Sequence, residues 1–146
     1  MTEEHRRISI RRARIEEIRP LAQEYRDEQG RDPESLPDPA LPQGGIFWLA
    51  VDGGGDPLGY AAGTLRPSGC TIGPVFARPT ARRHGVGEAL ITAIQDWAGD
   101  TRVPVVEISV AADNPTGLAF LENLGYEPRR ILMTRNPKRA RRAGPT

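Results

Sequence analysis

The chain has 146 residues, 38% of them hydrophobic and 27% charged, which is typical of one soluble globular domain and excludes a fibrous or disordered chain. No apolar run approaches the roughly 18 residues of a membrane-spanning helix, and the first ten residues lack the apolar core of a signal peptide. We therefore expect a cytoplasmic protein. A single cysteine, Cys70, with His5 and His84 is too small a set for a Cys/His zinc site, so no metal is expected.

The net charge of +1 is unevenly distributed along the chain. Residues 135–146 carry five basic side chains and no acid, which leaves −4 for residues 1–134. The five are Arg135, Lys138, Arg139, Arg141 and Arg142. A nucleic-acid-binding domain usually carries its positive charge on the folded body. Nucleic-acid binding is therefore not expected, and binding through the tail, which would be salt-sensitive, is the weakest hypothesis. We expect one domain over residues 1–134, followed by a basic, disordered tail.

Three segments open the chain. Two isoleucines that alternate with polar residues predict a half-buried strand over 7–13. Apolar residues at helical spacing predict an amphipathic helix over 15–29, which either begins near Pro20 or is kinked there. Residues 31–45 contain four prolines and no periodicity, which predicts a loop of the length that often carries a function.

Three strand-like runs follow, over 46–51, 58–65 and 70–77. Glycine, aspartate and proline separate the first two runs, and Pro-Ser-Gly separates the second from the third. These residues are typical of hairpin turns. The three runs are therefore expected to pair as antiparallel strands.

Helices and strands alternate in the second half of the chain. Apolar residues spaced by four, four and three predict a helix over 83–98, and the run VPVVEISVA predicts a strand over 103–111. Asn114 followed by proline is typical of a helix start, and Gly125 marks the end of that helix. A last strand is expected around 129–134. This order of elements predicts a single α/β core, a mixed and mostly antiparallel sheet with helices packed on it.

The segment over 75–87 leads from a strand through a short loop into a helix. At a helix start the first amide groups have no intrahelical acceptors, and the macrodipole adds about half a positive charge. Glycines at positions 85 and 87 let a ligand approach these amides, and Arg82 and Arg83 add positive charge. The pattern predicts a phosphate or pyrophosphate site. A glycine pair that only lets the helix pack closely is the alternative.

Two motifs of the chain resemble those of the GNAT family of N-acetyltransferases. The first is Arg82-x-x-Gly85-x-Gly87 after a strand, which is similar to the family's acyl-CoA-binding motif, Arg/Gln-x-x-Gly-x-Gly/Ala. The second spans 108–126 as Ile-x-Val-x-x-x-Asn and a helix that ends in Leu-Gly-Tyr, similar to the family's fifth strand and the helix after it. The resemblance covers residues 7–134.

The resemblance implies a sheet whose fourth and fifth strands splay apart, with helices on both faces, and acetyl-CoA as the cosubstrate. The backbone of Val75, Phe76 and Ala77 would pair with the amides of pantetheine as an added strand does. Asn114 would lie near the pantetheine arm or would only cap its helix. The amides of the loop would hold the pyrophosphate. That loop comprises Arg82, Arg83, His84, Gly85, Val86 and Gly87.

The family's usual catalytic pair has no match in this chain. Many members carry a tyrosine that protonates the departing thiolate, and the aligned position here is Leu121. Many also carry a glutamate on the fourth strand, and the run over 70–77 contains no acid. Glu107 is the only carboxylate of the run over 103–111, which makes it the candidate general base. Strand alternation places its side chain toward the cleft or toward solvent.

The sequence predicts an enzyme that transfers an acetyl group from acetyl-CoA to a primary amine of a small molecule or peptide. A non-catalytic acyl-CoA-binding regulatory module is the alternative. Residues 24–38 carry a local charge of −4, which favours a cationic acceptor through electrostatic steering. A solvated acidic helix face would explain the same charge. The sequence leaves both a monomer and a homodimer open.

Overall fold

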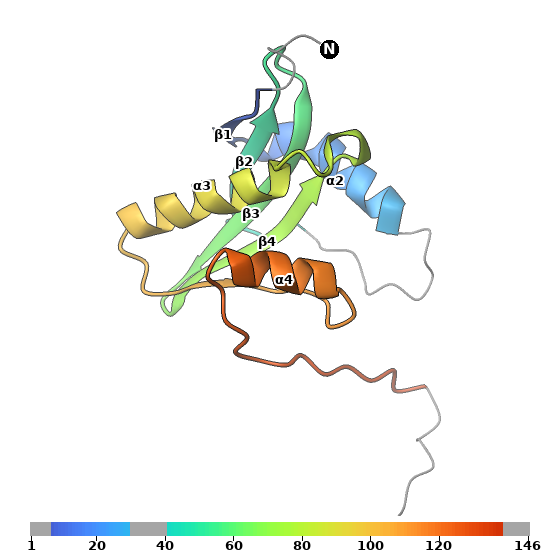
Figure 1. Ribbon diagram of the computed structural model, residues 1–146, viewed down its shortest axis with the longest axis vertical. Coiled ribbons are helices and arrows are strands. Elements are labelled where there is room, and N and C mark those ends of the chain that lie inside the picture. Colours follow the sequence, from blue (N-terminus) through green and yellow to red (C-terminus); the bar gives the residue numbers. More distant parts are fainter. Residues whose placement is uncertain (1–6, 30–40, 139–146) are drawn as a thin grey trace, which may run out of the picture. The chain divides into compact units, whose positions relative to one another are not determined.

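The computed structural model of the chain describes residues 7–29 and 41–138. Its contacts divide the chain into two units, Met1–Ser109 and Val110–Thr146. The first unit contains a five-stranded sheet in the order β1-β2-β3-β4-β5 with helices packed on it (Figure 1). Most of the predicted 31–45 loop and most of the basic tail lie outside the described residues.

The sheet is mostly antiparallel, as predicted. Its first four strands, each antiparallel to the next, are β1 (Ser9–Ala13), β2 (Ile46–Val51), β3 (Pro57–Arg66) and β4 (Gly69–Ala77). The fifth, β5 (Val106–Ile108), pairs parallel to β4. A parallel neighbour requires a crossover connection, and helix α3 (Val86–Asp100) lies in that connection. The mixed sheet predicted from the order of elements is therefore confirmed.

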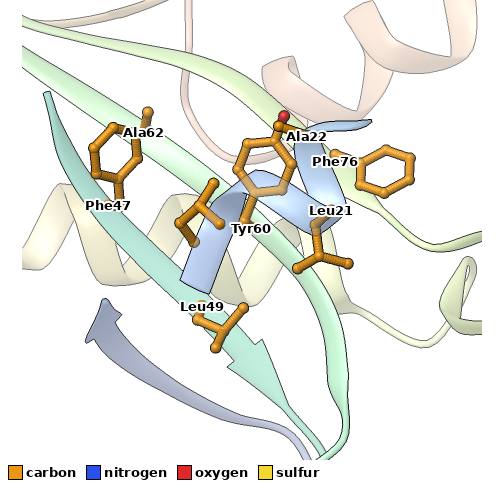
Figure 2. Packing of buried hydrophobic residues seen from close by; sticks show 8 residues of the cluster. Leu21, Ala22, Phe47, Leu49, Tyr60, Ala62 and Phe76 are labelled. Atoms are coloured by element: carbon orange, nitrogen blue, oxygen red, sulfur yellow. The ribbon is translucent and has the colours of Figure 1, made fainter. Parts of the chain in front are cut away.

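Helix α2 (Ile15–Gln29) covers one face of the sheet. It is a single helix that contains Pro20. Proline removes one backbone hydrogen bond from a helix interior, and burial of the apolar face of the helix offsets this loss. Figure 2 shows side chains of the buried cluster that the helix forms with the sheet. The cluster comprises Ile18, Leu21, Ala22, Phe47, Leu49, Tyr60, Ala62 and Phe76.

Helix α3 (Val86–Asp100) packs on the opposite face of the sheet. Side chains alternate between the two faces of a strand, so that Phe47 of β2 lies in the α2 cluster while Trp48 contacts α3. Trp48 meets Trp97 of α3 edge to face, with the ring centroids 5.3 Å apart. Both faces of the sheet are therefore covered by helices, which confirms the layer arrangement that the resemblance implied. No helix among the described residues is long and apolar enough to cross a membrane.

Two predicted strands differ from the structure. The strand predicted over 103–111 is limited to the three residues of β5, because only these pair with β4. The prediction of a strand over 129–134 is wrong, because those residues have no regular structure. The side chains of Ile131, Leu132 and Met133 are 85–87% exposed. A strand exists only through a hydrogen-bonded neighbour, and three consecutive apolar side chains lack the alternation that directs one face toward a core.

The second unit contains helix α4 (Pro115–Asn123). The side chain of Asn114 accepts a hydrogen bond from the amide of Gly117 at 2.9 Å, which is the cap geometry expected at a helix start. Beyond the end of the helix, Gly125 has a φ of +95°, the left-handed conformation that glycine favours. Both predicted ends of this helix are confirmed.

Candidate functional site

The outer edge of β4 is paired with β5 over only part of its length. The last residues in register are Ile72 and Ile108, and β4 continues to Ala77. The pairing ends where β4 also shifts register against β3, around Gly73 and Pro74. A bulge of this kind bends a strand and often ends pairing. Beyond it, this edge of β4 pairs with no strand of the described residues, as expected for splayed fourth and fifth strands.

Backbone direction along this edge follows from one hydrogen bond. The amide of Arg78 donates to the carbonyl of Leu58 on β3, at 2.8 Å. Because backbone groups alternate in direction along a strand, the N–H and C=O of Phe76 face β3, whereas those of Val75 and Ala77 face the outer edge. The resemblance placed Val75, Phe76 and Ala77 beside pantetheine. Of these, Val75 and Ala77 present backbone groups at the outer edge, whereas Phe76 has a buried side chain that is 4% exposed.

Helix α3 begins three residues later than predicted, after a loop that includes the short helix η1 (Pro79–Ala81). Gly85 is the residue before α3, and it has a φ of +83° and no side-chain cap. The amide of Ala89 donates to the carbonyl of Gly85, at 3.0 Å, as the first bond of an α-helix does. The amides of the helix's first turn precede this bond, so they are oriented to bind a ligand rather than the helix itself.

The two glycines of the motif are not explained by packing. Among the described residues, a Cβ atom placed on Gly85 or Gly87 would meet no heavy atom of another element within 4 Å, whereas one on Gly59 would collide with the carbonyl oxygen of Phe76. Close packing of α3 against the described residues therefore does not explain the glycine pair. The positive φ explains glycine at position 85. At position 87 neither strain nor crowding requires glycine, and the open space beside the first turn fits an anionic ligand.

The basic side chains of the loop have different surroundings. Arg83 and His84 are exposed, and Arg83 has a φ of +66°. Arg82 is also exposed, but its side chain forms an ion pair with Glu28 of helix α2, with 2.6 Å between Nη2 and Oε2. Its Nε also donates to the carbonyl of Ala77, at 3.1 Å. Arg82 therefore connects the loop to α2 and to the end of β4.

Glu107 lies on the sheet face opposite α3. It is in register with Thr71 of β4. The neighbouring Cys70 faces α3, because a Cβ atom on Gly63 would lie 3.5 Å from both the sulfur of Cys70 and a methyl group of Ile94. Strand alternation then places the Thr71 and Glu107 side chains on the other face, and Glu107 is exposed. The candidate base lies one residue before the end of the β4–β5 pairing.

Each of the remaining candidate groups has a structural role in the fold. Asn114 caps α4, and Leu121, where the family often has tyrosine, is 6% exposed. Cys70 is 1% exposed, and burial raises the pKa of its thiol, which disfavours the nucleophilic thiolate. Among the described residues no group of His, Cys, Asp or Glu could hold a metal ion.

Sequence reasoning missed the partners of the loop arginines. Glu24 and Glu28 were interpreted only as part of an acidic surface, but they pair with Arg78 and Arg82. The signal that could have revealed these pairs is their common spacing, since both the acids and the arginines are four residues apart. Two acids at i and i+4 on one helix face are matched by two bases at the same spacing in the loop.

Comparison with known proteins agrees with this geometry. The profile of the acetyltransferase (GNAT) family matches residues 12–126, and the chain belongs to this family. A candidate acetyl transferase from Pyrococcus furiosus is 21% identical, with a TM-score of 0.70 over 89% of this chain and 99% of that one. An acetyltransferase from Trypanosoma brucei is 17% identical, with a TM-score of 0.65 over 89% and 99%.

A third solved structure is AAC(6')-Iy, bound to a bisubstrate analogue of CoA and acetylneamine. It is 18% identical, with a TM-score of 0.61 over 89% of this chain and 98% of that one. At these identities the structural likeness establishes the fold. No curated protein sequence matches the chain.

Proposed function

We propose that this protein is an acetyl-CoA-dependent N-acetyltransferase that acts on a primary amine. The observation that carries the proposal is the open first turn of α3 with its two glycines, which a short loop joins to the part of β4 whose outer edge pairs with no described strand. Membership of the GNAT family supports the use of acyl-CoA. The domain would extend over residues 1–134, followed by the basic tail, and would act in the cytoplasm.

CoA would occupy two adjoining surfaces of the first unit. The amides between Arg82 and Gly87 would bind the pyrophosphate, because a helix start offers oriented N–H groups and positive potential to an anion. The outer edge of β4 at Val75 and Ala77 would pair with the amides of pantetheine, as a peptide does when it extends a sheet. This arrangement directs the thioester toward the end of the β4–β5 pairing.

Transfer requires a neutral amine that attacks the thioester carbon. The C–S bond then breaks, CoA leaves as a thiolate, and the nitrogen loses a proton. Glu107 is the proposed proton acceptor, directly or through a water molecule. Its side chain is exposed, and it lies one residue before the end of the β4–β5 pairing, toward which the thioester would be directed. At the position of the family's tyrosine, Leu121 has no proton to donate. When Glu107 takes the proton of the attacking nitrogen, the thiolate would be protonated by solvent or would leave unprotonated. Without Glu107 as acceptor, the ammonium formed in the attack would give its one proton to the thiolate.

A Glu107→Gln variant tests this role, because it keeps the shape of the side chain and removes its basicity. We expect kcat to fall by about 10²-fold, with little change in the KM for acetyl-CoA. A variant that retains full kcat at every pH would show that Glu107 is structural. Catalysis would then depend on positioning and water alone.

The charge near helix α2 bears on the acceptor. Glu24 and Glu28, two of the acids that favoured a cationic amine, are paired with Arg78 and Arg82. Steering of a cation would therefore depend on Asp27 and on acids outside the described residues. The proposal is accordingly a primary amine of a small molecule or peptide, with a cationic amine as the acceptor to test first.

The alternative function is a non-catalytic module that binds acyl-CoA, and the observation in its favour is the missing catalytic pair. Acetyl-CoA turnover against a panel of polyamines, aminoglycosides, basic peptides and neutral amines separates the two. Release of the CoA thiol, together with a mass increase of about 42 Da on the amine from an acetyl group replacing hydrogen, would support acetyl transfer. CoA binding without any acetylated amine would favour the module.

A further inference from the structure

Helix α2 is joined to the loop before α3 by two ion pairs. The Nε atom of Arg78 lies 3.1 Å from Glu24 Oε1. Arg82 Nη2 lies 2.6 Å from both carboxylate oxygens of Glu28. The two arginines flank η1 on either side, and the two acids are one helical turn apart on α2. Both ends of this short segment are therefore fixed to the same helix.

The guanidinium of Arg82 is held by three groups. Besides Glu28, its Nε donates to the carbonyl of Ala77, at 3.1 Å, and its Cζ lies 5.9 Å from the ring centroid of Phe76. The Phe76 ring is itself fixed, because it stacks on Tyr25 of α2 with a centroid distance of 5.0 Å and an interplanar angle of 12°. The direction of Arg82 is thus determined by α2 on one side and by the last residues of β4 on the other.

The hydrogen bond between the Arg82 side chain and the Ala77 carbonyl joins the two ends of the segment that leads into the anion site. Residues 77–82 are therefore constrained at both ends. A site made of backbone amides binds an anion well only when the amides are already oriented, because ordering a loop on binding costs affinity. Among the described residues Glu28 bonds to the side chain of Arg82 and to no backbone amide of the site, so its effect on the amides would pass through Arg82.

We propose that Glu28 is a positioning residue for the CoA-binding loop and acts through Arg82. The inference rests on the proposed function, since it assumes that the loop binds CoA. The proposal predicts that removing the Glu28 carboxylate changes CoA affinity in the direction opposite to the one that charge alone would give. Removing a carboxylate near an anionic ligand should strengthen binding by simple electrostatics, whereas loss of loop positioning should weaken it.

The test is calorimetry with CoA and steady-state kinetics with acetyl-CoA on Glu28→Gln and Asp27→Asn. Asp27 lies beside Glu28 on α2 and accepts a hydrogen bond from Gln23, at 2.8 Å, so its substitution removes the same charge without releasing Arg82. Glu28→Gln should raise the Kd for CoA and the KM for acetyl-CoA by about 2- to 5-fold, the range of a partly exposed ion pair. We expect a smaller change in kcat. Asp27→Asn should leave the Kd unchanged or lower it.

A double-mutant cycle tests whether Glu28 acts through Arg82. In an Arg82→Gln background, Glu28→Gln should have no further effect on CoA binding. Binding by Glu28→Gln that equals or exceeds the wild type would overturn the inference, as would an undiminished effect in the Arg82→Gln background. Wild-type protein that binds no CoA would overturn the proposed function and this inference with it. Wild-type binding with an unchanged Glu28→Gln variant would overturn this inference alone.

Discussion

Replacing Gly87 by alanine should stabilise the fold and weaken CoA binding. Gly87 is the second residue of α3, and a Cβ atom there would meet no heavy atom of another described element within 4 Å. In a helix, alanine is more stable than glycine by about 0.5–1 kcal/mol. For a chain of this size, that gain corresponds to a rise in Tm of about 1–4 °C.

The same methyl group would occupy the space that a pyrophosphate needs beside the first-turn amides. Loss of one charge-assisted hydrogen bond costs about 1.5–3 kcal/mol, which corresponds to a fall in CoA affinity of about 10- to 100-fold. The two effects have opposite signs because the folded chain does not need glycine at this position, whereas the ligand does. If glycine were required at this position for close packing, its replacement by alanine would instead lower the stability of the protein.

Thermal unfolding and CoA calorimetry on the same preparation measure both effects. Gly99→Ala is the matched control, because Gly99 lies in the same helix and its Cβ position is equally open, but it is near the opposite end. The control should gain similar stability and bind CoA as the wild type does. The reasoning is refuted if Gly87→Ala binds CoA with wild-type affinity or unfolds at a lower temperature than the wild type.

Three further predictions concern the rest of the fold. Hydrogen bonds, above all from Arg11, lower the pKa of Glu17 from 4.5 to about 2, so the stability that this carboxylate contributes is complete above pH 4.5 and is lost toward pH 2. Urea unfolding between these pH values should show a weaker pH dependence for Glu17→Gln. Gly59→Ala should lower the free energy of unfolding by about 1–3 kcal/mol, because the new Cβ would collide with the Phe76 carbonyl; an unchanged urea midpoint would contradict this. Cys70→Ala should keep its kcat within about twofold of the wild type, since a buried thiol with a raised pKa is no nucleophile, and a loss of activity without unfolding would count against that view.

Periodicity predicted most of the sheet and both long helices, because each has a face that the alternation or the helical spacing marks as buried. It failed for residues 129–134, where strand formation depends on a hydrogen-bonded neighbour and not on the residues themselves. Pro20 was ambiguous for a similar reason. Its local cost favours a break, while the burial of Ile18 and Leu21 on either side favours a continuous helix.

The candidate site was predicted in part. The positions of Gly85 and Gly87 follow from the motif, and the open space beside them agrees with it. The partner of Arg82 did not follow, because Glu28 lies 54 residues away in the sequence and a charge run does not indicate which acid meets which base. The equal four-residue spacing of the two acids and the two arginines is compatible with such pairs, but the placement of the helix on the sheet is what identifies them.

The most direct test of the CoA site is calorimetric titration of CoA into the wild type, Gly85→Asn and Gly85→Asp. Gly85 has a φ of +83°, a conformation that asparagine and aspartate tolerate better than other side chains, so both variants should fold at a similar cost. Only aspartate places a negative charge beside the proposed pyrophosphate. We expect CoA to bind the wild type, to bind Gly85→Asn more weakly, and to show no measurable binding to Gly85→Asp. Equal binding by the aspartate and asparagine variants would contradict the placement of CoA at the start of α3.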